Sequence, residues 1–208
     1  MRLNTNSWNR LRYTFYAPFY DRIAEVLEPH RKRSIQSLEL GASDKVLVLG
    51  AGTGLDLPYL RGVGHVSAGD ISPAMVEKIR SRSAGLGKEV DARILDGQNI
   101  DYPDSSFDAV VLHLIVAVIP DPYACMREVV RVLKPGGTVA VFDKFVKPGE
   151  APGLARRLAN LFTSALFSDI TRDIDKIIFG TGMTKISDIP VAFGGNFRVI
   201  KLLKNEER

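Results

Sequence analysis

VLVLGAGTG, residues 46–54, joins a short run of aliphatic residues to three closely spaced glycines. A continuous run of β-branched and aliphatic residues is typical of a parallel strand that is buried on both faces. Glycine has no Cβ, so the turn after such a strand can bring its backbone close to a ligand at the carboxyl edge of an open α/β sheet. The stretch therefore predicts a buried strand, a ligand-binding loop and, after the loop, a helix.

Around this stretch, apolar runs alternate with helical patterns. Four further strands are predicted over 65–70, 90–97, 107–116 and 138–145. Helices are predicted over 72–84, which opens with Ser-Pro, and over 122–133, which ends before Lys-Pro-Gly-Gly. Strands that alternate with helices in this way form a doubly wound α/β sheet.

The C-terminal part of the chain has a different pattern. An amphipathic helix is predicted over 153–168 and a second helix over 169–179. Residues 184–191 and 197–203 are predicted as strands joined through Gly194-Gly195-Asn196, which is a hairpin signal. A hairpin that closes a parallel sheet makes the last strand antiparallel.

The composition is that of one soluble globular domain, with 208 residues of which 45% are hydrophobic and 25% charged. The longest apolar run, 109–119, is interrupted by His113 and is far shorter than the roughly 20 residues that span a bilayer. The N-terminus lacks the features of a signal peptide. The single cysteine, Cys125, excludes an internal disulfide. We therefore expect a cytoplasmic protein.

The net charge of +4 conceals an uneven distribution along the chain. Residues 1–40 carry seven Lys or Arg against four Asp or Glu, residues 41–143 carry ten against thirteen, and residues 144–208 carry eleven against seven. The basic N-terminal part also holds an apolar stripe at four-residue spacing from Leu11 to Leu27, bordered by aromatic residues. We expect the outer segments either to complete the core and cover a ligand or to face an anionic membrane surface.

Two acidic residues lie at the ends of predicted strands and strengthen the case for a nucleotide-like ligand. Asp70 lies twenty residues after Gly50, where a carboxylate can accept hydrogen bonds from both hydroxyls of a ribose. A nicotinamide-dinucleotide site predicts the same acid, but its motif places a small residue at position 55, where this chain has Leu55. Asp96 lies at the end of the third strand, and Asp108, which opens the fourth, is predicted to be structural.

Four motifs, VLVLGAGTG, AGDIS, LDGQNIDYPDSSFDAVVL and LKPGGTVAVFD, occur in this order over residues 44–145. Together they resemble the class I S-adenosylmethionine-dependent methyltransferases. The resemblance implies S-adenosyl-L-methionine as the cofactor. It also implies a Rossmann-like, doubly wound, seven-stranded and mostly parallel sheet with an antiparallel last strand and an N-terminal helical cap.

The resemblance also implies roles for individual residues. The glycines of the loop would flank the methionine part of the cofactor, Asp70 would hold the ribose hydroxyls, Ile71 would pack on adenine, and Asp96 would receive the adenine amino group. The predicted cofactor-binding residues are Gly50, Ala51, Gly52, Gly54, Asp70, Ile71, Asp96, Gly97, Gln98 and His113. The sequence departs from the family at Val48, where members usually carry an acid, and this departure predicts weaker cofactor binding or lost activity.

Residues outside the nucleotide-binding core must determine which molecule accepts the methyl group. YAPFYD (16–21), HLIVAVIPDP (113–122), VFDKF (141–145) and SDITRDID (168–175) resemble the bacterial phosphatidylethanolamine N-methyltransferases, a branch close to the ubiquinone and menaquinone methyltransferases. The resemblance implies a lipid amine as acceptor.

An amine must lose a proton before its lone pair can attack, so a nearby base would help. The candidate catalytic residues for this step are Tyr20, His113, Tyr16 and Asp143. Arg172 is a candidate either for holding a phosphate or for a salt bridge on a helix surface.

We therefore predict a single methyltransferase domain over 1–208, divided into an N-terminal helical cap (1–40), a cofactor-binding core (41–145), a helical lid insertion (146–183) and a terminal hairpin (184–208). The expected partner is a lipid or small-molecule methyl acceptor, and the protein could lie on the inner face of the membrane. The alternatives are a methyltransferase acting on a quinone-type ring or another small molecule, and a non-catalytic protein that binds S-adenosylmethionine. No metal site and no nucleic-acid partner are expected, and the oligomeric state is left open.

Overall fold

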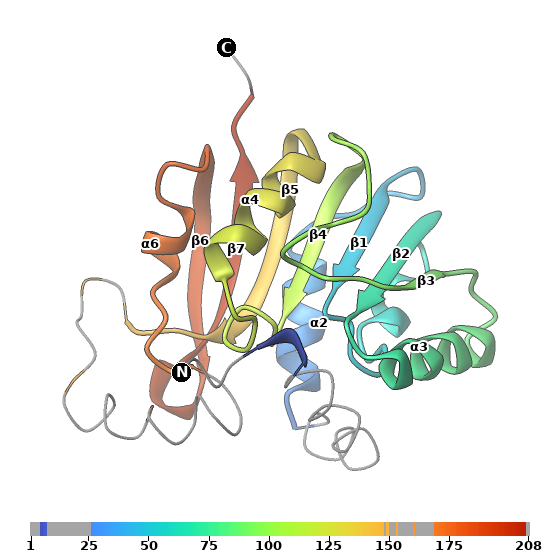
Figure 1. The fold of residues 1–208 in the computed structure, drawn as a ribbon, viewed down its shortest axis with the longest axis horizontal. Coiled ribbons are helices and arrows are strands. Elements are labelled where there is room, and N and C mark those ends of the chain that lie inside the picture. Colours follow the sequence, from blue (N-terminus) through green and yellow to red (C-terminus); the bar gives the residue numbers. More distant parts are fainter. Residues whose placement is uncertain are drawn as a thin grey trace.

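The computed structural model describes residues 5–7, 26–147, 149, 153, 160 and 169–206. Its centre is a seven-stranded sheet with the strand order β3-β2-β1-β4-β5-β7-β6 (Figure 1). The strands are β1 (Lys45–Leu49), β2 (His65–Asp70), β3 (Asp91–Ile94), β4 (Phe107–His113), β5 (Leu133–Lys144), β6 (Met183–Ala192) and β7 (Phe197–Lys204). Strands β1 to β5 pair in parallel, and β7 runs antiparallel to both β5 and β6. The predicted fold class is confirmed.

Helices cover both faces of this sheet, as Figure 1 shows for α2 and α4. Within the described residues, the helices include α2 (Glu28–Gln36), α3 (Pro73–Gly85), α4 (Pro122–Val132) and α6 (Ile174–Ile178), together with the short 3-10 helices η1 (Leu57–Leu60) and η2 (Phe193–Gly195). Leu47 and Leu49 of β1 pack toward the side of α4 and α6, whereas Val46 and Val48 pack toward the side of α2 and α3. This two-sided burial explains why β1 is aliphatic from Val46 to Leu49.

The structure corrects the predicted ends of several elements. The glycine loop leads into the 3-10 helix η1 rather than an α-helix, because Asp56 turns inward into a buried ion pair just before Pro58. Strand β3 is shorter than 90–97, and β4 ends at His113 because Leu114 adopts a positive φ of 60° that turns the chain. Strand β5 begins at Leu133, earlier than predicted, and takes in the Pro-Gly-Gly segment beside a register shift in its pairing with β4.

The predicted helix over 169–179 is also shorter in the structure. Asp169 closes a turn by accepting hydrogen bonds from the backbone N–H and the hydroxyl of Thr171. Helix α6 begins only after Asp173, whose side chain accepts a hydrogen bond from the N–H of Asp175 and caps the helix. These short-range side-chain bonds compete with a longer helix.

Much of the predicted cap and lid falls outside the described residues. Of the predicted cap, the structure describes residues 5–7 and 26–40, which include α2; the helix predicted over 153–168 lies outside the described residues apart from 153 and 160. The division into cap, core, lid and hairpin stays a prediction. Among the helices that the structure describes, none is long and apolar enough to cross a bilayer.

Candidate functional site

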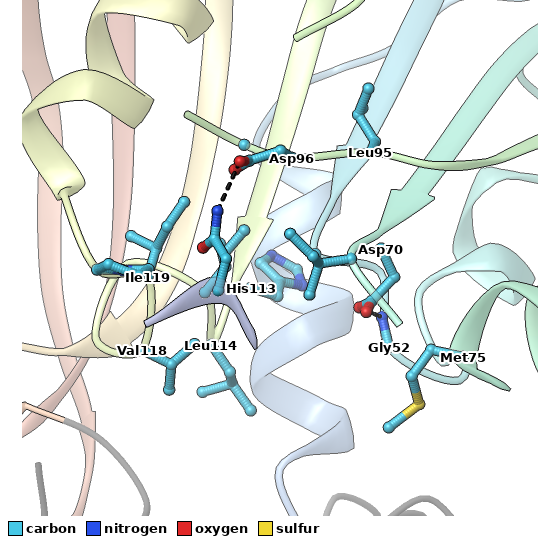
Figure 2. Close-up of a pocket in the computed structure, with 15 residues that line it drawn as sticks. Gly52, Asp70, Met75, Leu95, Asp96, His113, Leu114, Val118 and Ile119 are labelled. Atoms are coloured by element: carbon cyan, nitrogen blue, oxygen red, sulfur yellow. Dashed lines mark hydrogen bonds between the residues drawn. The ribbon is translucent and has the colours of Figure 1, made fainter. Parts of the chain in front are cut away.

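A pocket lies at the carboxyl ends of β1, β2 and β4, where the glycine loop meets the loop 114–120 (Figure 2). Its empty volume, including the solvent at its open mouth, is about 640 Å³. It is lined by Asn6, Gly50, Gly52, Asp70, Ile71, Met75, Leu95, Asp96, Gly97, His113, Leu114, Ile115, Val118, Ile119 and Pro120. Carboxyl ends of strands are where open α/β sheets bind ligands.

The glycine loop forms one wall of the pocket in a conformation that side chains disfavour. Gly50, Gly52 and Gly54 have φ values of 66°, 56° and 80°, which lie in the left-handed region that glycine adopts without steric cost. A Cβ at Gly50 would also lie 2.5 Å from Cδ1 of Ile115. The first glycine therefore lets the loop pack directly against the opposite wall of the pocket.

Asp70, at the end of β2, ties the glycine loop to the start of α3. Its Oδ2 accepts a hydrogen bond from the N–H of Gly52 at 2.9 Å, and its Oδ1 accepts one from the N–H of Ser72 at 2.9 Å. Burial raises the pKa of Asp70 above its usual value, although these two hydrogen bonds oppose the rise. The carboxylate both supports the loop and lines the pocket.

Asp96 forms the other polar end of the pocket. Its Oδ1 accepts a hydrogen bond from the N–H of Gln98 at 2.9 Å, and its Oδ2 accepts one from Nδ2 of Asn6 at 2.6 Å, drawn as a dashed line in Figure 2. Nε2 of Gln98 donates to Oδ1 of Asn6 at 3.0 Å. Sequence reasoning missed Asn6, and no local signal could have found it, because its partner lies 90 residues further along the chain.

His113 lies at the end of β4, and both of its ring nitrogens have buried partners. Nδ1 lies 2.8 Å from Oδ1 of Asp56, and Nε2 lies 3.0 Å from Oγ of Ser34 on α2. Nη1 of Arg31 lies 3.0 Å from Oδ2 of Asp56. Burial alone raises the pKa of Asp56, but the contacts with His113 and Arg31 outweigh burial and hold the pKa of this carboxyl well below its usual range.

This buried polar network connects α2 to the floor of the pocket. Of its members, only His113 was predicted. Asp56 carried a signal in the sequence, because it is an acid between two leucines directly after the glycine motif. Arg31 and Ser34, the members from α2, gave no signal in the sequence, since nothing local shows that a residue of that helix reaches β4.

Asp143 and Arg172 hold the loop that forms the apolar wall. Asp143 is fully buried; its Oδ2 accepts a hydrogen bond from the N–H of Ala117 at 2.8 Å, and burial raises its pKa. The guanidinium of Arg172 donates to the backbone carbonyls of Val116 and Ile119 and lies 3.7 Å from Asp169. Both side chains therefore position residues 114–120. The side chain of Arg172 is buried and that of its partner Asp169 is partly exposed, and both residues precede α6 rather than lie on its surface.

The predicted site residues divide into three groups. Those that line the pocket are Gly50, Gly52, Asp70, Ile71, Asp96, Gly97 and His113. Those that do not line it are Ala51, Gly54, Gln98 and Asp143. Tyr16 and Tyr20 lie outside the described residues. Whether these residues bind the cofactor or act in catalysis stays a prediction.

Two further residues named from the sequence face away from the pocket. Oδ2 of Asp108 accepts a hydrogen bond from the N–H of Lys45 at 2.9 Å, and its Oδ1 binds Nζ of Lys134 at 2.6 Å, as a structural role requires. Val48 is 1% exposed and packs in the core between the sheet and α3. A carboxylate at position 48 would therefore be buried among aliphatic side chains in this chain.

Comparisons with known proteins find similarity to methyltransferases. Residues 47–141 match the family described as "Methyltransferase domain". A phosphatidylethanolamine N-methyltransferase from Cereibacter sphaeroides is 27% identical over 204 residues, covering 97% of this chain and 98% of that protein. A demethylmenaquinone methyltransferase from Corynebacterium urealyticum is 38% identical over 124 residues, covering 58% of this chain and 51% of that protein, so the chain spans about half of the quinone relative.

The fold also recurs among solved structures. A SAM-dependent methyltransferase from Aquifex aeolicus superposes with a TM-score of 0.70 and 20% sequence identity, covering 92% of this chain and 98% of that chain. At this level of identity the likeness shows the fold alone.

Proposed function

Because this chain is an S-adenosylmethionine-dependent methyltransferase with a methyltransferase domain over residues 47–141, we propose that it methylates the amine of a phospholipid such as phosphatidylethanolamine. The observation that carries the proposal is the relationship to phosphatidylethanolamine N-methyltransferase along 97% of this chain. The quinone relative, by contrast, matches 58% of this chain.

The pocket fits the cofactor in its chemistry. Two carboxylates, Asp70 and Asp96, line it, and an apolar wall that includes Ile71 runs along it. We propose that Asp70 binds the ribose hydroxyls, that Asp96 binds the adenine amino group, and that Gly50 and Gly52 let the backbone approach the methionine part. When bound, the cofactor supplies an activated methyl group.

A cluster of packed apolar side chains beside the pocket supports a lipid acceptor. Leu114 lines the pocket and also packs against a cluster made by Leu27, Phe142, Phe197 and Val199. Phe193, at the tip of the β6–β7 hairpin, packs against Phe197 with tilted rings whose centroids are 5.2 Å apart, and it is 67% exposed. Packed side chains thus connect an exposed aromatic ring to the pocket wall.

One basic residue contacts this cluster, and a second follows it in the chain. Nζ of Lys144 lies 5.3 Å from the centre of the Phe197 ring, and Lys147, which follows at the end of β5, is exposed. An exposed aromatic ring beside lysines suits the interface of an anionic bilayer, where each nearby lysine contributes about 1 kcal/mol of binding. We propose that this edge of the molecule contacts the membrane while the acceptor headgroup enters the pocket.

For removal of the amine proton we propose Tyr20 or Tyr16. Of the other two candidates, Asp143 is sealed in the interior, and both ring nitrogens of His113 already have buried partners. On this proposal, Tyr20→Phe or Tyr16→Phe lowers kcat for methyl transfer and changes its pH profile, while S-adenosylmethionine affinity stays the same. Unchanged kinetics in both variants would instead assign removal of the amine proton to His113.

The cofactor site is tested by isothermal titration with S-adenosylmethionine. Asp70→Ala removes the proposed ribose acceptor and is expected to lower affinity at least tenfold, whereas Asp101→Ala, which changes an exposed acid outside the pocket, keeps wild-type affinity. Equal affinity in the two variants would reject the assignment of Asp70.

The acceptor is tested with methyl-labelled S-adenosylmethionine and vesicles of phosphatidylcholine and phosphatidylglycerol, with or without phosphatidylethanolamine. Label is expected in the lipid phase only when phosphatidylethanolamine is present. Phe193→Ser is expected to weaken vesicle binding and transfer, while Phe179→Ser serves as the matched control, because Phe179 is 87% exposed and lies beyond the other end of β6. Transfer that is independent of phosphatidylethanolamine would contradict the lipid proposal.

A second candidate acceptor is a quinone-type ring, favoured by the 38% identity to the demethylmenaquinone methyltransferase. It predicts methylation of demethylmenaquinone in detergent and no effect of phosphatidylethanolamine. Running both acceptors side by side separates the two candidates.

A further inference from the structure

The amide of Asn6 occupies the polar end of the pocket that Asp96 forms. Its Nδ2 donates to Oδ2 of Asp96 at 2.6 Å, and its Oδ1 accepts from Nε2 of Gln98 at 3.0 Å. Asn6 is partly buried and lines the pocket, and Figure 1 shows the short segment 5–7 in dark blue at the carboxyl ends of the central strands. A residue from the start of the chain is thus seated among the groups proposed to bind adenine.

A carboxamide resembles one edge of adenine in its hydrogen bonding. Each presents an NH₂ donor beside an acceptor, and Asp96 with Gln98 presents the complementary acceptor and donor. We infer that Asn6 is an internal competitor for the adenine end of the cofactor pocket, so that residues 5–7 must leave Asp96 before the cofactor binds there. The inference rests on the proposed function, since it assumes that Asp96 receives the adenine amino group.

The geometry favours competition over joint binding. The contact between Asn6 and Asp96 is short and charge-assisted, which makes it one of the stronger kinds of hydrogen bond. Oε1 of Gln98 is fixed by the N–H of Asp121 at 2.9 Å, so the amide of Gln98 keeps its donor turned toward Asn6. Asp96 and Gln98 therefore bind Asn6 through the same carboxylate acceptor and amide donor that would bind the adenine edge.

Competition of this kind lowers the apparent cofactor affinity by the fraction of molecules in which the site is open. If residues 5–7 are bound at Asp96 in about nine wild-type molecules of ten, Asn6→Ala binds S-adenosylmethionine about tenfold more tightly than wild type. Ser7→Ala is the matched control, because Ser7 is exposed in the same segment and does not line the pocket. Its affinity is expected to equal that of wild type.

The experiment combines titration calorimetry with the fluorescence of Trp8, which is the sole tryptophan of the chain and lies two residues after Asn6. In wild type, S-adenosylmethionine is expected to shift Trp8 emission as the segment is released. Asn6→Ala is expected to show most of that shift before any cofactor is added, together with the tighter dissociation constant.

The outcomes separate this inference from the proposed function. If wild type and both variants fail to bind S-adenosylmethionine, the proposed cofactor site is wrong. If wild type binds and Asn6→Ala binds equally or more weakly, the site stands and the competition is refuted; weaker binding would make Asn6 a direct ligand of the cofactor.

Discussion

The buried ion pair between Arg31 and Asp56 gives a sharp test of how α2 is held to the sheet. The two side chains are 4% and 2% exposed, and Nη1 of Arg31 lies 3.0 Å from one carboxylate oxygen of Asp56 and 3.2 Å from the other. Arg31→Met removes the guanidinium and keeps most of the side-chain volume. Asp56 is then left buried with His113 as its partner from this network.

Removing one partner of a buried ion pair typically costs about 3–5 kcal/mol, because the remaining charge has lost its compensation. Since His113 still contacts Asp56 at 2.8 Å, we expect a value near the lower end, about 3 kcal/mol, for Arg31→Met. In a domain of this size that corresponds to a fall in Tm of about 6–12 °C. Thermal unfolding followed by circular dichroism at pH 7 measures it. Arg33→Met, an exposed change on the same helix, is expected to stay within about 0.5 kcal/mol of wild type.

The penalty should also depend on pH with a definite sign. The pKa of Asp56 is lowered in the folded protein, so its stabilising contribution is present above the ordinary pKa of an aspartate and is lost as the pH falls toward its folded value. In Arg31→Met the folded pKa of Asp56 rises, so the carboxylate can be neutralised in mild acid. The difference in unfolding free energy between wild type and variant should therefore shrink as the pH falls from 7 to about 4. A Tm loss equal to that of Arg33→Met, or a penalty that is constant with pH, would refute this reasoning.

Two further substitutions test other parts of the structure. Gly50→Ala should lower unfolding free energy by about 1–3 kcal/mol and weaken cofactor binding, because residue 50 has a φ of 66° and the new Cβ would lie 2.5 Å from Ile115. Gly62→Ala, where an added Cβ meets nothing within 4 Å, is the control for chemical denaturation, and an equal loss there would contradict the steric argument. Lys204→Met should cost about 2 kcal/mol, because its buried ammonium donates to two backbone carbonyls at the end of α4, at 2.9 and 2.8 Å. Lys176→Met, at an exposed position, should change the Tm little, and similar Tm losses in the two lysine variants would show that these contacts contribute nothing.

The central sheet could be predicted because its signals are local. Strands β1 and β4 are nearly continuous aliphatic runs, as expected for strands that are buried on both faces. The glycine loop and Asp70 were predictable for the same reason, since a tight turn and an acid at the end of the next strand are separated by a fixed, short length of chain. The ends of elements were predicted less well where a side chain bonds its own backbone, as Asp173 does at the start of α6.

His113 and Asp143 show what a strand-end position leaves open. Both follow apolar runs at the carboxyl edge, and the sequence offers both as bases. In the structure the ring of His113 is joined to Asp56 and Ser34, and Asp143 binds the backbone of the loop 114–120. Which face of the strand a side chain takes, and what approaches it from another element, determines its partners.

The amino-acid sequence by itself determined the sheet, its order of elements and the motif that approaches the ligand, because periodicity and spacing act over short stretches of chain. Only the tertiary structure decided that Asn6 reaches Asp96, and that Arg31 of α2 neutralises Asp56 beside the pocket floor. These contacts join residues 90 and 25 positions apart. No pattern along the chain records such contacts, because they form only when the packing of distant elements buries a charge or an amide that then needs a partner.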